Sequence, residues 1–185
     1  NEEVLSNRWR QHIGSQLTNK KVGIIGCGHV GKDLIKLLQP FECEIFVNDI
    51  LDYPEFFKEY RITTLSLDDL LSVSDIVSIH VPLNDSTKNL INAERLLLMK
   101  PTAVLINTAR GGLVDEYALR TALVSSALAA AAFDVFSIEP PEDDKLLRLD
   151  NFISTPHIGG SSIEAIIAMG QSAIDGLDNN YIPEV

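Results

Sequence analysis

Short apolar runs alternate with helix-type segments along the chain. Continuous runs of this kind are typical of parallel strands that are covered by helices on both faces. Because helical patterns separate them, the alternation favours βαβ units over a set of buried helices. We predict an α/β fold, a doubly wound parallel sheet of the Rossmann type with helices on both faces. Its strands are expected at residues 21–26, 44–48, 62–65, 75–81, 103–107, 129–133 and 151–154.

The intervening segments show where helices begin and end. One apolar helical face runs from Val30 to Leu38 and is ended by Pro40. The spacing of Ser66 and Asp69 resembles a capping box at the start of a second helix.

Two later helices are also predicted. One begins with acidic residues at Asp115 and Glu116, which favour the positive end of a helix. A last helix is expected behind a capping box of Ser161 and Glu164. Residues 1–16, which include Trp9, are interpreted as a leading helix or connector, and residues 17–180 as one domain.

Charge and cysteine content restrict the function classes. The 185 residues carry a net charge of −11, which argues against nucleic acid or an anionic membrane as partner. Cys27 and Cys43 form no CxxC pattern, and two cysteines without a pattern are typical of a protein from a reducing, cytoplasmic compartment. The sequence suggests no metal site. No apolar run is long enough to span a bilayer and no signal peptide opens the chain, so we expect a cytoplasmic location without membrane attachment.

Residues 26–31 read GCGHVG, a GxGxxG pattern between a predicted strand and a predicted helix. Gly26 would permit the tight turn, Gly28 would let a pyrophosphate approach the backbone, and Gly31 would let the helix pack closely. Asp49 ends the second strand, where a carboxylate accepts hydrogen bonds from ribose and repels a 2′-phosphate. The pattern predicts NAD binding; FAD or another nucleotide, or a plain glycine-rich turn, are the alternatives.

Three groups suited to acid–base chemistry follow later strands. Arg110 can hold a carboxylate in two hydrogen bonds, His157 can exchange a proton near neutral pH, and Glu139 can pair with that imidazole. Each alone could be an ordinary surface or loop residue. Asp134 is either a cofactor contact at a strand end or a turn residue. Because ligands bind at the carboxyl ends of parallel strands, we predict that these groups converge on an acidic substrate.

Taken together, these residues resemble the NAD-binding domain of the D-isomer-specific 2-hydroxyacid dehydrogenases. The most specific motifs are NTARGGLVDE at 107–116, DVFSIEPPE at 134–142 and TPHIGG at 155–160. The resemblance implies hydride transfer between NAD(H) and a small 2-hydroxy or 2-oxo acid. It implies Arg110, Glu139 and His157 as catalytic residues, in which Arg110 binds the substrate, His157 exchanges the proton and Glu139 supports His157.

The resemblance also implies a set of cofactor contacts beyond the glycines and Asp49. They are His29, Val30, Val81, Pro82, Thr87, Thr108, Asp134, His157, Gly159 and Gly160.

Ala130 stands where the family commonly has glycine, a change expected to affect packing only. The family's substrate domain is expected to be absent from these residues, so the chain alone should bind NAD without turnover. A homodimer that uses the segment around Trp9 is expected, and a non-catalytic, NAD-sensing corepressor-like module is the alternative function.

Overall fold

The computed structural model describes residues 2–11, 13–141 and 144–178. Within these residues, seven parallel strands form one sheet in the order β3-β2-β1-β4-β5-β6-β7. The chain builds outward from β1 to β3, crosses back to β4, and then builds outward to β7. This order confirms the predicted doubly wound sheet. The strands are β1 (Lys21–Ile25), β2 (Glu44–Asn48), β3 (Thr63–Thr64), β4 (Ile76–Ile79), β5 (Val104–Asn107), β6 (Ala130–Phe133) and β7 (Phe152–Ser154).

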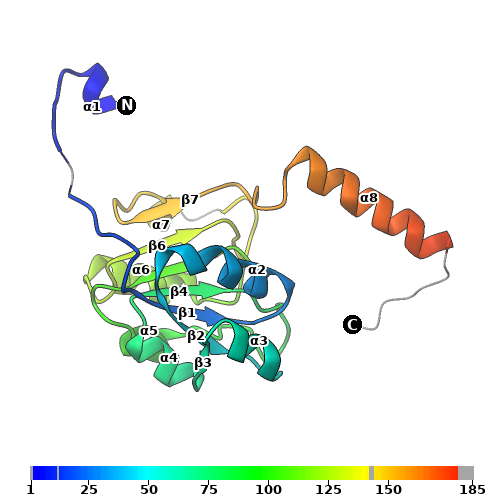
Figure 1. Ribbon diagram of the computed structural model, residues 1–185. Coiled ribbons are helices and arrows are strands. Elements are labelled where there is room, and N and C mark those ends of the chain that lie inside the picture. Colours follow the sequence, from blue (N-terminus) through cyan, green and yellow to red (C-terminus); the bar gives the residue numbers. More distant parts are fainter. Residues whose placement is uncertain (1, 12, 142–143, 179–185) are drawn as a thin grey trace.

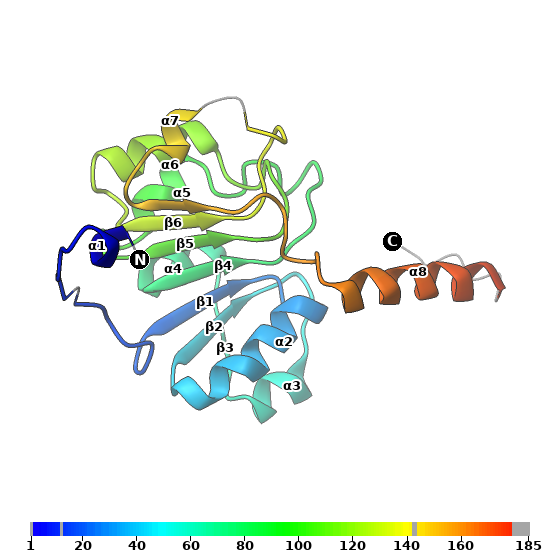
Figure 2. The ribbon, with the colours of Figure 1, turned by 90° about the horizontal axis from the view of Figure 1, so that it is seen from above.

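Helices cover the sheet on two sides. Figures 1 and 2 show α2 and α3 on one face and α4, α5 and α6 on the other. The helices are α1 (Glu2–Leu5), α2 (His29–Leu38), α3 (Pro54–Glu59), α4 (Leu67–Val73), α5 (Ala93–Leu98), α6 (Glu116–Val124), α7 (Asp144–Leu147) and α8 (Ile163–Asp178), with a 3₁₀ turn η1 (Gln39–Phe41) that contains Pro40.

Alternate residues of β1 enter different cores, which explains the two layers. Ile24 packs in a cluster with Ile35 of α2 and Val47 of β2, whereas the next residue, Ile25, packs with Leu70 of α4. Successive strand side chains point to opposite faces. An uninterrupted apolar run is therefore required wherever both faces are covered.

The strands β5 and β6 differ from this expectation. Their burial alternates along the strand, because α4, α5 and α6 cover one face and the other is open over these strands. A groove of about 470 Å³ lies between α2 and the strands β4 and β5, lined by Leu34 of α2, Ile76 and Ser78 of β4, and Ile106 of β5. The prediction of helices on both faces holds for the sheet, and this groove remains open on one face beside β4 and β5.

Side-chain caps begin several helices. Ser66 Oγ accepts a hydrogen bond from Asp69 N at α4, and Asp115 Oδ1 accepts from Ala118 N at α6. For α8 the prediction was one residue early: Ser162, not Ser161, caps the helix by accepting from Ala165 N at 3.0 Å. A cap accepts from the backbone N–H groups two and three positions on, and the helix starts at residue 163.

The two ends of the described chain leave the sheet. The helix α8 extends away from the sheet in both views, the α1 segment does so in Figure 1, and Trp9 is 83% exposed. Leu17 packs beside the α2 core. Residues 179 and 180, included in the predicted domain, lie outside the described residues. Among the described residues, no helix combines the length and apolar character that crossing a membrane requires.

Candidate active site

The candidate residues gather at one edge of the sheet because every strand is parallel. The glycine loop follows β1, Asp49 follows β2, and Arg110 follows β5. Glu139 and His157 follow β6 and β7 on the same edge. The carboxyl ends of β1 and β4, where strand order reverses, form the crevice in which such sheets bind ligands.

The glycine loop has the shape of a dinucleotide cradle. Gly26 has φ +94°, and Gly31 lies so close to the Gly26 carbonyl that an added Cβ would sit 2.2 Å from that oxygen. An added Cβ at Gly28 would meet nothing within 4 Å, so its backbone is open to a ligand. The loop ends at the N-terminus of α2, whose free N–H groups favour an anion. These features fit the pyrophosphate of NAD.

Asp49 closes this cradle from β2. Its carboxylate accepts hydrogen bonds from Cys27 N at 2.5 Å and from Leu51 N at 2.8 Å. A carboxylate has further lone pairs with which to accept ribose hydroxyls. Burial raises the pKa of the Cys27 thiol, so this cysteine stays neutral beside the phosphate site.

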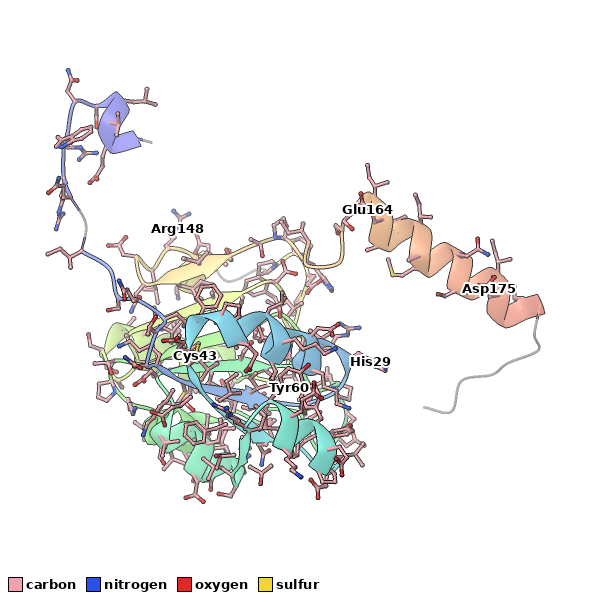
Figure 3. The ribbon with its side chains drawn as sticks, in the orientation of Figure 1. His29, Cys43, Tyr60, Arg148, Glu164 and Asp175 are labelled. Atoms are coloured by element: carbon pink, nitrogen blue, oxygen red, sulfur yellow. The ribbon has the colours of Figure 1, made fainter. Side chains whose placement is uncertain are left out.

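The first helical residues lie beside the cradle. His29 opens α2, and Figure 3 shows its side chain projecting outward from the domain. Val30 is 64% exposed and faces the open groove, where Thr108 at the end of β5 is also found.

The loop after β4 forms the facing wall of the crevice. An added Cβ at Gly26 would lie 2.8 Å from the side chain of Val81. Thr87 Oγ1 donates to the Pro82 carbonyl at 2.7 Å, which closes the loop. His80 forms a hydrogen bond with Ser78 at 2.9 Å, and burial lowers the pKa of this imidazole, so His80 is a hydrogen-bonded, partly buried residue just after β4.

Arg110 projects from a turn that Asn107 organises. The buried Asn107 side chain donates to the Arg110 carbonyl at 2.9 Å and accepts from Ala109 N at 3.1 Å. The guanidinium is exposed and its Nη1 donates to the Ala109 carbonyl at 2.6 Å. Gly111 touches the next loop, since an added Cβ would lie 1.9 Å from the Phe136 carbonyl oxygen.

Asp134 organises the loop that carries His157. Its oxygens accept hydrogen bonds from Thr155 Oγ1, Ile158 N and Gly159 N at 2.5, 2.9 and 2.8 Å. Burial alone would raise the pKa of the Asp134 carboxyl, but these hydrogen bonds outweigh it and hold the pKa below its usual range. An added Cβ at Gly160 would meet nothing within 4 Å.

His157 and Glu139 form a hydrogen-bonded pair. His157 Nδ1 lies 2.8 Å from Glu139 Oε2, and Glu139 Oε1 accepts from Phe136 N at 3.0 Å. The bond to His157, with that from Phe136 N, lowers the pKa of the Glu139 carboxyl. Both side chains border a cavity of about 360 Å³ beside Phe136 and Pro156. The carboxylate fixes the imidazole and leaves Nε2 for a proton transfer.

Three supporting residues were not predicted from the sequence. They are Asn107, Glu116 and Ser137. Asn107 donates a hydrogen bond to the Arg110 carbonyl and so holds that turn. Glu116 Oε1 accepts hydrogen bonds from both the backbone N–H and the hydroxyl of Ser137. Asn107 and Glu116 lie inside the NTARGGLVDE motif, but Glu116 was interpreted only as a helix-opening acid. Nothing in the spacing indicates a contact across 21 residues.

Comparison with known proteins agrees with this geometry. The family model described as "D-isomer specific 2-hydroxyacid dehydrogenase, NAD binding domain" matches residues 1–159. A hydroxypyruvate reductase of Thermotoga maritima is 41% identical over 165 residues, 88% of this chain and 53% of the relative. A D-3-phosphoglycerate dehydrogenase of Escherichia coli K12 is 46% identical over 151 residues, 79% of this chain and 36% of the relative.

Solved structures share the fold. A D-lactate dehydrogenase from Sporolactobacillus sp. has a TM-score of 0.87 at 32% identity, over 99% of this chain and 60% of that one. An NAD-complexed D-isomer specific 2-hydroxyacid dehydrogenase from Lactobacillus delbrueckii ssp. bulgaricus has a TM-score of 0.83 at 31% identity, over 93% and 57%. The chain thus spans about half the length of several proteins that it matches. It belongs to the D-isomer specific 2-hydroxyacid dehydrogenase family, as an NAD-binding domain.

Proposed function

We propose that this chain is the NAD-binding domain of an oxidoreductase that interconverts a 2-hydroxy acid and a 2-oxo acid. The observation that carries the proposal is the His157–Glu139 pair, 2.8 Å apart, at the same sheet edge as the open glycine cradle. A module that only senses NAD needs the cradle but not a paired imidazole and carboxylate. The pair therefore favours an enzyme over the sensing alternative.

Each residue has a distinct role in the proposed reaction. The exposed guanidinium of Arg110 binds the substrate carboxylate and the oxygen at C2. His157 Nε2 gives a proton to that oxygen in reduction and takes it back in oxidation, while Glu139 stabilises the charged imidazolium. The glycine loop, Asp49 and the remaining predicted cofactor residues hold NAD, which supplies or accepts the hydride.

The chain is proposed to work within a longer protein whose second domain closes over the substrate. Substrate positioning and exclusion of water come from such closure. In that longer protein, Arg110→Ala and His157→Ala should each lower kcat/KM for a 2-oxo acid by about a hundredfold or more while NADH affinity stays within about twofold. Unchanged turnover in either variant would remove the assigned roles.

NADH binding by this chain is the direct test. Calorimetric titration should show tighter binding of NADH than of NADPH, because the Asp49 carboxylate repels a 2′-phosphate. Asp49→Ala should weaken NADH binding and reduce the preference for NADH over NADPH about tenfold. The matched control is Asp52→Ala, an exposed carboxylate three residues away. Failure of both nucleotides to bind this chain and the longer protein would contradict the proposal.

We further propose a cytoplasmic homodimer. The reducing compartment is supported by two free cysteines, Cys27 and Cys43. The dimer is supported by the exposed apolar side chains of the leading segment, among them Leu5 and Trp9. Light scattering after gel filtration tests it, and Trp9→Ala should shift the mass toward one chain.

A further inference from the structure

A carboxylate at the start of α6 holds the loop that carries Glu139. Glu116 Oε1 accepts from Ser137 N at 2.7 Å and from Ser137 Oγ at 2.8 Å. Two hydrogen bonds to one charged oxygen are stronger than a typical neutral pair. Asp115 already caps α6, so the Glu116 side chain is free of that task.

This contact lies next to the acid–base pair. Ser137 is two residues before Glu139, and the adjoining Phe136 N donates to Glu139 Oε1 at 3.0 Å. The same loop is pressed from its other side by Gly111, which leaves no room for a Cβ against the Phe136 carbonyl. The turn that presents Arg110 and the loop that presents Glu139 are therefore locked together at two points.

We propose that Glu116 is a positioning residue for catalysis: by clamping Ser137 it fixes the Glu139 carboxylate in register with His157. The inference rests on the proposed function, since it assigns Glu116 a part in that acid–base step. Asp134 also faces His157, from the end of β6, and holds the opposite side of the pair through Ile158 N and Gly159 N. Glu116 thus supports the Glu139 side and Asp134 the His157 side.

The test measures the pKa of the Glu139 carboxyl by carbon NMR, in protein that carries an isotope label at the carboxyl carbon of its glutamates. In the unsubstituted protein the bond from His157 lowers the pKa of Glu139. Glu116→Ala should raise that pKa toward the ordinary glutamate value, because the loop is no longer held and the bond to His157 lengthens. Glu116→Gln keeps an acceptor oxygen, so the pKa of Glu139 should stay close to its value in the unsubstituted protein.

Two further variants make the result decisive. Glu94→Ala removes an exposed acid from the first turn of α5 and should leave Glu139 unchanged. Ser137→Ala removes one of the two donors to Glu116 and should raise the pKa of Glu139 by less than Glu116→Ala does. If Glu116→Ala does not fold, Ser137→Ala serves as the test variant in its place. In the longer protein, Glu116→Ala should lower kcat about tenfold with little change in KM for NADH.

A Glu139 titration that is unchanged while the melting temperature falls would show a purely structural contact and overturn the proposal. The NMR measurement needs neither NAD nor substrate. If neither this chain nor the longer protein binds a nucleotide while the Glu139 shift is present, the proposed function alone is contradicted.

Discussion

At the scale of single residues, three glycines of one loop meet different surroundings. Gly31 has no room for a side chain because the Gly26 carbonyl lies against it, whereas Gly28 faces open space. Packing therefore requires a glycine at position 31, whereas the backbone at Gly28 is open to a ligand. The sequence pattern predicted a separate role for each glycine, and the space around each one agrees with that prediction.

This difference predicts opposite outcomes for two alanine variants. Gly31→Ala should lower the free energy of unfolding by about 2 kcal/mol, as overpacked sites do. Gly28→Ala should leave stability unchanged and weaken NADH binding at least about tenfold, because its Cβ occupies the space that the pyrophosphate needs. Urea denaturation and calorimetry measure the two effects. Equal stability losses in both variants would show that the cradle is structural only.

Asp134 gives a pH-dependent prediction. Its pKa is lowered in the folded chain, so its stabilising effect is complete above the unfolded pKa and is lost as pH falls through the folded value. Asp134→Asn should cost about 2 kcal/mol at pH 7, since an amide cannot accept from all three loop donors. The cost should shrink below about pH 4.

Denaturation midpoints at several pH values test this, with the exposed Asp150→Asn as control. A cost that is independent of pH would mean that the charge of Asp134 contributes nothing to the loop.

At the scale of elements, apolar runs located all seven strands within one or two residues. This worked because strands covered on both faces consist mostly of apolar residues, although Ser78 is a buried polar position within β4. Cover by helices is incomplete at β5, where Ile106 lines the open groove beside Leu34 of α2. Helix starts at Ser66 and Asp115 were correct because a cap is a local hydrogen bond. The start of α8 was misplaced because adjacent serines offer the same chemistry.

At the scale of the whole molecule, α8 stands apart from the sheet. The side chains of residues 163–177 are exposed apart from partial cover at Ala165, and Figure 3 shows Glu164 and Asp175 with no other described element beside them. A 16-residue helix without tertiary contacts is marginally stable in water. Several of its apolar side chains, including Ile166, Ile167 and Met169, are exposed.

Limited proteolysis tests this arrangement. Thermolysin should cleave within residues 163–178 well before the sheet, because these residues open without global unfolding. Mass spectrometry should then find a resistant product that retains residues 21–154. Equal resistance of α8 and the sheet in a monomer would contradict the arrangement, whereas protection that depends on protein concentration would indicate that a second copy covers the helix.

The sequence alone determined the elements, the class of fold and the residue types of the site. Those depend on local rules: strand periodicity, caps, the glycine spacing, and the motifs around Arg110 and His157. The tertiary structure decided which groups meet. The motifs suggested that Glu139 could pair with His157, but only the fold brings the two together across 18 residues, and the Glu116–Ser137 clamp across 21 residues was not suggested by any motif. Such contacts depend on strand order and on the path of each loop, and neither is encoded in any short stretch of chain.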